Sequence, residues 1–288
     1  MRVLVLGGSG QVARAVTASV PKNHSVIVKT HKDLDIADEA AVKLALTGGK
    51  FDWIVNGAAY TAVDLAETEF EKARKVNETA VGILARVAAG AGCRLMHLST
   101  DFVFDGQSNR AYLPGDPTNP LSGYGRSKLG GEQEVLTQSG DAIILRTAWV
   151  YASTGKNFAL TMLRLLREKD EVRVVADQIG TPTWATGIAQ AIWGLIEVSA
   201  AGGIYHWTDL GIATWYDFAT AIQDEALARG LLVRAVPVIP IATSDYPTPA
   251  QRPAFSVLNT ESTRALVSAP ARHWRHNLRM MLNELRTE

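Results

Sequence analysis

Cysteine is almost absent from this sequence: Cys93 is the only one in 288 residues. A single thiol excludes an intrachain disulfide and any metal site built from several cysteines. Its position in the apolar segment CRLMHLST predicts an inert, buried side chain. This cysteine usage is consistent with a reducing compartment.

An excess of one charge and a long hydrophobic run are missing as well. The 29 basic residues balance 29 acidic ones, and no block of Lys or Arg is present. Neither nucleic acid nor an anionic membrane is therefore expected as a partner. The N-terminal segment MRVLVLGG has one basic residue and an apolar stretch too short for a signal peptide or a spanning helix. We expect a cytoplasmic protein that binds a small molecule.

Short β-branched runs alternate with longer segments of helical period along the first half of the chain. This alternation predicts an α/β fold, with a Rossmann-type, doubly wound parallel sheet covered by helices on both faces. Beyond residue 151, prolines at positions 182, 237, 240, 247, 249 and 253 break the chain into shorter elements that predict a smaller C-terminal lobe. The predicted strands are residues 2–6, 24–30, 52–58, 94–100 and 142–151, and the predicted helices are residues 11–19, 66–91 and 124–136.

Glycines follow the first predicted strand directly. Gly7, Gly10 and Ala13 form the pattern G-x-x-G-x-x-A, in which glycine permits a tight turn and lets backbone amides approach a pyrophosphate at a helix N-terminus. The two residues between the glycines are typical of short-chain reductases. We therefore expect residues 1–151 to form mainly an NADP-binding domain. Residues 152–288 are expected to form mainly a substrate-binding lobe, with some elements returning to the first domain.

The end of the second strand bears on the choice between NADPH and NADH. NAD-selective proteins place an acidic side chain there to bind the ribose hydroxyls. The strand here ends in Lys29-Thr30-His31-Lys32, without a carboxylate. Lys29 and His31 are candidates to bind a 2′-phosphate, which favours NADPH, with NADH as the alternative. The competing interpretation is that these are solvated loop charges.

A tyrosine and a lysine lie four residues apart in the segment YGRSK. On a helix, Tyr124 and Lys128 share one face, so an ammonium group can act on a phenol that would otherwise be a poor proton donor or acceptor at neutral pH. Ser99-Thr100-Asp101 ends an apolar strand, and the carboxyl ends of parallel strands open into the ligand crevice. Thr100 is the candidate to hold a substrate oxygen beside Tyr124. Asp101 is either a sugar ligand or a turn cap.

With these residues placed, the chain resembles the dTDP-4-dehydrorhamnose reductases, a family of extended short-chain dehydrogenases/reductases. The resemblance runs nearly from end to end. The matching segments are GGSGQVA, NGAAYTAVDLAE, KVNETAVGILA, LSTDFVFDG, YGRSKLGGE, LRTAWVY, KNFALTMLRL, DQIGTPTW, GIYHWTD with WYDFA, and QRPAFSVLN.

This resemblance implies NADPH-dependent reduction of the C4 keto group of a dTDP-4-keto-6-deoxyhexose, most directly dTDP-4-dehydrorhamnose to dTDP-rhamnose, with Tyr124 as the proton donor. It implies catalytic roles for Thr100, Tyr124 and Lys128. The residues implied or expected to contact the cofactor are Gly7, Gly10, Gln11, Val12, Lys29, His31, Asp35, Ile36, Ala59, Tyr60, Thr61, Tyr124 and Lys128.

The same resemblance places other residues at the nucleotide-sugar. Thr100, Asp101 and Tyr124 are expected to touch the substrate, and the Trp149 ring could stack on a sugar or base, unless it packs between the lobes. Asn157, Thr183 and Arg252 lie in matching segments of the lobe. Arg252 suits a diphosphate because its planar guanidinium donates two parallel hydrogen bonds.

The chain departs from the family pattern at the first helix. Family members that dimerise through a shared Mg²⁺ have a Glu where this chain has Ala15. Without that carboxylate we expect no metal at this position, while a homodimer remains possible through apolar helix faces.

Two other functions compete with simple ketone reduction. Dehydratases on the same fold place an Asp-Glu pair after the active-site Thr, whereas here Asp101 precedes Phe102, which cannot transfer a proton. A non-catalytic, NADP-binding regulatory subunit is the rival from another class, and the intact Thr100, Tyr124 and Lys128 argue against it. A reductase of a different nucleotide 4-ketodeoxysugar is the third alternative, since one scaffold serves several substrates.

Overall fold

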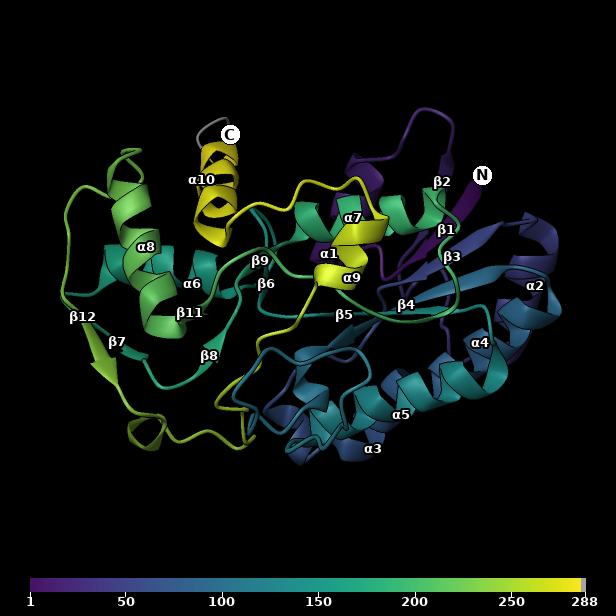
Figure 1. Cartoon of the computed structure of the whole chain (residues 1–288), viewed down its shortest axis with the longest axis horizontal. Helices are drawn as coiled ribbons and strands as arrows, with labels where there is room; N and C mark the ends of the chain where they lie inside the picture. The colour runs from purple at the N-terminus through teal and green to yellow at the C-terminus, as the bar shows by residue number, and fades with distance from the viewer. Residues whose placement is uncertain (286–288) are drawn as a thin grey trace.

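A six-stranded parallel sheet forms the centre of the protein (Figure 1), seen in a computed structural model that describes residues 1–285. The strand order is β10-β5-β4-β3-β1-β2. The strands are β1 (Arg2–Leu6), β2 (Ser25–Lys29), β3 (Trp53–Asn56), β4 (Arg94–Thr100), β5 (Ile143–Thr147) and β10 (Gly203–His206). Every pairing between them is parallel, which confirms the predicted sheet.

Helices cover both faces of this sheet, because its strands are apolar on both sides. On one face, Val3 and Val5 pack in a cluster with Ile188 and Ile192 of α7. On the other face, Leu4 and other residues of β1, β3 and β4 pack against α2 and α4. The covering helices are α1 (Gln11–Ala18) and α7 (Ala185–Glu197) on the first face, and α2 (Glu39–Gly49), α4 (Ala80–Gly90) and α5 (Gly123–Gln138) on the second.

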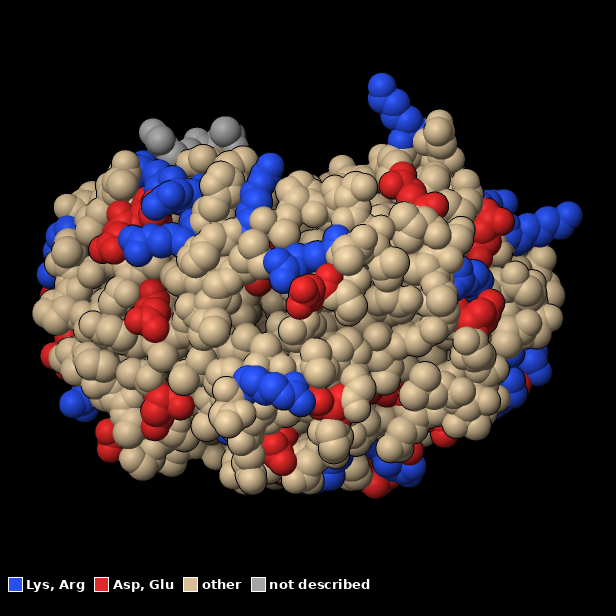
Figure 2. All heavy atoms as spheres, in the orientation of Figure 1, with Lys and Arg blue, Asp and Glu red and all other residues tan. Residues whose placement is uncertain are grey.

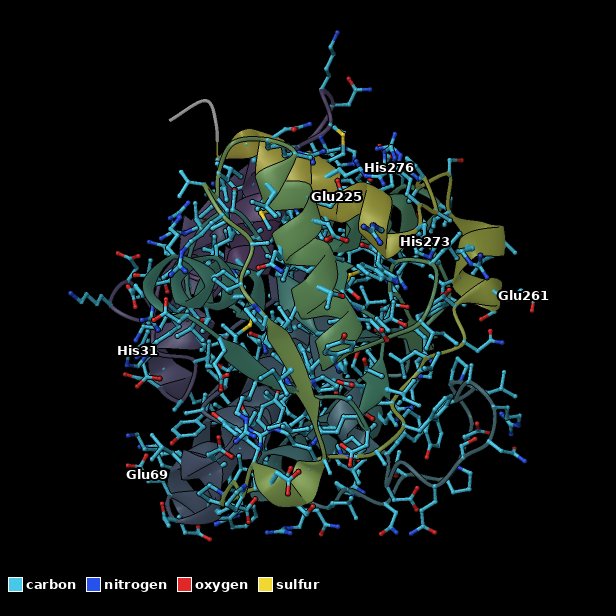
Figure 3. All side chains as sticks on the ribbon, turned by 90° about the vertical axis from the view of Figure 1, so that its left-hand side faces the viewer. His31, Glu69, Glu225, Glu261, His273 and His276 are labelled. Atoms are coloured by element: carbon cyan, nitrogen blue, oxygen red, sulfur yellow. The ribbon has the colours of Figure 1, made fainter. Side chains whose placement is uncertain are left out.

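A second core lies at the opposite end of the molecule, to the left in Figure 1. Its helices are α6 (Phe158–Glu168), α8 (Trp215–Leu227) and α10 (Trp274–Glu284), beside the parallel strands β7 (Val172–Val175) and β12 (Val238–Ile241). Glu225, labelled in Figure 3, joins α8 to α10 through Arg275 and Arg279, at 3.1 and 2.8 Å. Although β10 and α7 come late in the chain, they belong to the central sheet and its cover.

Two predicted elements prove to be interrupted. The helix predicted over residues 66–91 divides into η1 (Leu65–Glu67), α3 (Phe70–Arg74), a π-helical turn η2 (Lys75–Thr79) and α4. The strand predicted over residues 142–151 ends at Thr147, and β6 (Val150–Tyr151) pairs with β9 (Thr183–Trp184) outside the central sheet. Trp149 separates the two strands with a φ of 47°, a conformation that few bulky residues adopt. Helix α2 had no counterpart in the prediction.

The remaining elements are short. They are η3 (Asp101–Val103), β8 (Ile179–Gly180), β11 (Ala213–Thr214), η4 (Thr243–Asp245) and α9 (Glu261–Leu266). Cys93 is a free thiol whose predicted burial is confirmed, and burial raises its pKa to about 12. Among residues 1–285, no helix combines the length and apolar character needed to cross a membrane. On the face in Figure 2, acidic and basic side chains are interspersed.

Candidate active site

The turn after β1 has the shape that a nucleotide phosphate requires. Gly7 has a φ of +75°, and a Cβ at this position would lie 2.6 Å from the backbone nitrogen of Ala58. Gly10 precedes α1, whose N-terminus has no side-chain cap and no acidic residue in its first turn. The amides of Gln11 and Val12 therefore lack a side-chain acceptor, and the helix dipole adds a partial positive charge at this end.

The tip of β2 differs in one respect from the sequence-based expectation. A carboxylate does lie there: Asp33 accepts hydrogen bonds from the amide and hydroxyl of Thr30, at 2.9 and 2.7 Å, and these bonds lower its pKa. The carboxylate is thus held by its own turn. His31 is exposed at the outer edge of the molecule, on the side opposite Glu261 (Figure 3). Lys29 is half-buried at the strand end.

The next turn presents two more predicted cofactor residues in different ways. Asp35 accepts a hydrogen bond from the amide of Ala37 at 2.9 Å and lies 3.8 Å from His31. Ile36 is only 4% exposed and packs in the core on the face of the sheet covered by α2 and α4.

Asn77, which the sequence analysis did not single out, holds the loop after β3. This loop contains the predicted cofactor residues Ala59, Tyr60 and Thr61. The Asn77 side chain accepts from the amide of Tyr60 at 2.8 Å, donates to its carbonyl at 3.0 Å, and donates to Ser127 Oγ at 3.0 Å. Asn77 lies in the π-helical turn η2, a feature often found at functional sites. It ties the loop to α5, the helix of the predicted catalytic residues.

Thr100 and Tyr124 meet at the carboxyl end of β4. The Thr100 hydroxyl lies near the Tyr124 phenol and acts to lower its pKa, and the Phe102 ring contacts the phenol ring edge-on, with centroids 5.8 Å apart. Thr100 Oγ1 also lies 3.1 Å from Asp101 Oδ1. Asp101 is 2% exposed, and burial raises its pKa to about 6.

Burial raises the pKa of Tyr124 to about 12, while the Thr100 hydroxyl opposes the rise. The sequence analysis expected Lys128 to lower this pKa. In the structure, Lys128 Nζ instead donates to the carbonyl of Leu98 at 2.6 Å and lies 3.2 Å from His97 Nε2. The phenol is therefore protonated at neutral pH, which is the state required of a proton donor.

Trp149 was predicted to stack on a sugar or base, but its ring is stacked on Trp215. The two centroids are 3.4 Å apart and the planes differ by 4°. The Trp149 ring also lies against Gly180, where a Cβ would come within 2.5 Å of it. Trp215 thus covers one face of the indole, as expected for the alternative in which Trp149 packs between the lobes, and stacking on a ligand stays a prediction.

Two other lobe residues are occupied by structural hydrogen bonds. Asn157 caps α6 by accepting from Leu160, and its amide donates to Gln11 Oε1 at 2.9 Å and to two backbone carbonyls. Thr183 is fully buried and donates to the carbonyl of Thr181. The hydrogen bond from Asn157 to Gln11 links the lobe to the start of α1.

A cavity of about 530 Å³ lies in the lobe beside Arg252. It is lined by apolar and aromatic side chains, among them Phe158, Met162 and Trp215. Arg252 forms an ion pair with Asp64 at 2.9 Å and also donates to Thr248. Asp64 lies in the loop after β3, so this ion pair joins the two halves of the molecule across the site.

Comparison with known proteins agrees with this geometry. The family model described as "RmlD substrate binding domain" matches residues 1–287. The dTDP-4-dehydrorhamnose reductase of Burkholderia thailandensis is 39% identical over 295 aligned positions, covering 99% of each chain. The chain belongs to this family. It is therefore an oxidoreductase with the extended short-chain reductase fold, as the sequence predicted.

Solved structures of dTDP-4-dehydrorhamnose reductases superimpose along nearly the whole chain. The Clostridium acetobutylicum protein is 36% identical with a TM-score of 0.93, covering 99% of this chain and 100% of its own. The Bacillus anthracis protein, crystallised in complex with NADP, is 31% identical with a TM-score of 0.92, covering 98% and 99%. A UDP-glucose 4-epimerase of Thermus thermophilus is 18% identical with a TM-score of 0.84, covering 99% of each chain, which shows a common fold alone.

Proposed function

We propose that this reductase uses NADPH to convert the C4 ketone of dTDP-4-dehydrorhamnose to the alcohol, forming dTDP-rhamnose. The observation on which this rests is the meeting of Thr100, Tyr124 and Lys128 around the carboxyl end of β4, beside a turn shaped for a nucleotide. The full-length similarity to dTDP-4-dehydrorhamnose reductases supports the choice of substrate.

The turn after β1 suits NADPH, because Gly7 lets the chain pass close to the backbone of Gly57 and Ala58, and the N-terminus of α1 has no side-chain cap. Gly7, Gly10, Gln11 and Val12 would hold the diphosphate through backbone amides. Bound there, NADPH supplies the hydride for the reduction. The NADP complex of the Bacillus anthracis relative supports this assignment.

Lys29 and His31, near the tip of β2, would bind the 2′-phosphate. Asp33 stays ionised, because the hydrogen bonds from Thr30 lower its pKa, and the positive charge of Lys29 would offset its repulsion of the phosphate. Asp35, the Ile36 backbone and the loop of Ala59, Tyr60 and Thr61 would enclose the adenosine and nicotinamide halves.

The proton required by the new alcohol would come from Tyr124. Its raised pKa keeps the phenol protonated at pH 7, and it can give that proton to the ketone oxygen as hydride adds to C4. Thr100 would orient the same oxygen through its hydroxyl. Lys128, as an ammonium, would stabilise the phenolate that forms.

The nucleotide part of the substrate would occupy the 530 Å³ cavity of the lobe. Trp215 and Phe158 offer aromatic surface for a base, and Arg252 offers two donors for the diphosphate. Binding by Arg252 would compete with its ion pair to Asp64. Asp101, buried next to Thr100, would bind a sugar hydroxyl.

NADPH oxidation tests this proposal. Wild-type protein should oxidise NADPH when dTDP-4-dehydrorhamnose is added, and Tyr124→Phe serves as the matched control because it removes only the phenol hydroxyl. Two further assays test the alternative functions. They measure dehydration of dTDP-glucose with NAD and reduction of 4-ketosugars linked to other nucleotides. NADPH binding without any oxidation would indicate a non-catalytic binding subunit and refute the proposal.

A further inference from the structure

His97 lies behind the proposed active site in a fully buried position on β4. Its Nδ1 is 3.1 Å from the side-chain nitrogen of Asn56 on β3, and its Nε2 is 3.2 Å from Lys128 Nζ on α5. Thus one imidazole connects two strands of the sheet to the proposed catalytic lysine. The sequence analysis gave this histidine no role.

The hydrogen bonds of Asn56 indicate which nitrogen of the His97 imidazole has the proton. Asn56 Oδ1 accepts from the amide of Ala58 at 3.1 Å, so the amide nitrogen of Asn56 faces His97 and donates to Nδ1. Burial and the nearby Lys128 lower the pKa of His97 well below its ordinary value, so the ring is neutral. A neutral ring that accepts at Nδ1 must have its hydrogen on Nε2, directed at Lys128 Nζ.

An N–H group directed at Nζ favours the amine form of Lys128, which has a lone pair to accept it. The ammonium form has no lone pair and would require the other tautomer of His97, at the expense of the hydrogen bond from Asn56. The charge on Lys128 and the tautomer of His97 are therefore coupled. Since Nζ also donates to the carbonyl of Leu98 at 2.6 Å, the contact with His97 is one of two that fix its position.

We propose that His97 is a positioning residue that holds Lys128 against β4 and controls its protonation through this tautomeric contact. The inference rests on the proposed function, in which the ammonium of Lys128 assists Tyr124. Asn56 contributes to this positioning, because its amide favours the His97 tautomer whose Nε2–H is directed at Lys128 Nζ.

Other ionisable groups surround Lys128 from the elements packed against it. Glu132, one turn further along α5, raises the pKa of Lys128, but its carboxylate is held by Arg146 of β5 at 2.6 Å. Asp101 of η3 and Tyr124 of α5 lie on the substrate side. The contact of His97 with Nζ is direct, so replacing this ring should change the titration of Lys128 most specifically.

Two substitutions separate the contacts of His97. The shorter amide of His97→Asn can keep the contact that Nδ1 makes with Asn56, but it cannot reach Lys128. The longer amide of His97→Gln can keep the contact that Nε2 makes with Lys128. The readout is the pH dependence of kcat for dTDP-4-dehydrorhamnose reduction, with KM for NADPH measured in parallel. His97→Asn should lower kcat about tenfold or more and move the high-pH limb by about half a unit or more. His97→Gln should recover most of kcat, and KM for NADPH should change less than about threefold in both.

His206→Asn is the matched control, because His206 is equally buried on β10 and its ring contacts Tyr112 and Arg146 rather than Lys128. It should lose thermal stability, as His97→Asn does, yet keep the wild-type pH profile. Equal profiles for wild type and His97→Asn, or equal losses of kcat in the two His97 variants, would overturn the inference while leaving the proposed function intact. A wild-type protein without reductase activity would overturn both.

Discussion

The buried ammonium of Lys128 should lower the free energy of unfolding at neutral pH. Its side chain is 2% exposed, and burial lowers its pKa from 10.5 to about 8. The unfolded chain therefore binds more protons than the folded one between these two values, so stability rises with pH across that window. At pH 7 the unfavourable contribution is about 3 kcal/mol, because each pKa unit corresponds to about 1.4 kcal/mol.

Comparison with Lys128→Met isolates this contribution, since the two proteins share all other titrating groups. Urea unfolding of each protein at about pH 7 and about pH 9.5 gives the difference in unfolding free energy. The wild type should gain about 2 kcal/mol relative to Lys128→Met over that interval, because most of the penalty is lost as the ammonium deprotonates. A difference that changes by less than about 0.5 kcal/mol would show that Lys128 titrates as it does in water and would refute the reasoning.

Further predictions concern other parts of the site. Tyr124→Phe should keep NADPH binding in a fluorescence titration but lower turnover at least about a hundredfold, and unchanged turnover would refute its role. The value of kcat/KM should be higher with NADPH than with NADH, because Lys29 would bind the 2′-phosphate, and a higher value with NADH would show that Lys29 does not. Dialysis against EDTA should change neither activity nor mass in light scattering, given Ala15, and a loss of either would reveal another metal site. Gly180→Ala should lower the unfolding free energy by about 1–3 kcal/mol in urea, because its Cβ would collide with Trp149; an unchanged value would contradict that packing.

Local patterns in the sequence predicted the features that depend on neighbouring residues. The β-branched runs identified five of the six central strands, all but β10, and the spacing of Tyr124 and Lys128 identified one face of α5. The glycines after β1 indicated the tight turn. These features follow from backbone geometry and helix periodicity, which residues a few positions apart determine. The family and the fold were correctly predicted for the same reason, since the motifs are local.

Features that depend on distant residues could not be read from such patterns. The partner of Arg252 is Asp64, 188 positions earlier in the chain, and no local signal indicates this ion pair. The sequence left open whether Trp149 stacks on a ligand or packs between the lobes, because it could not indicate that Trp215 covers one face of its ring. The π-helical turn at Asn77 leaves the apolar period nearly intact, so a continuous helix was the natural prediction.

Isotope transfer tests the central claim most directly. The protein is incubated with dTDP-4-dehydrorhamnose and NADPH that is deuterated at the nicotinamide C4, and the sugar product is analysed by mass spectrometry and NMR. The account predicts dTDP-rhamnose with one deuterium bonded to C4 of the hexose, and almost none in the Tyr124→Phe reaction. A product without deuterium at C4, or a C4 epimer of rhamnose, would contradict it.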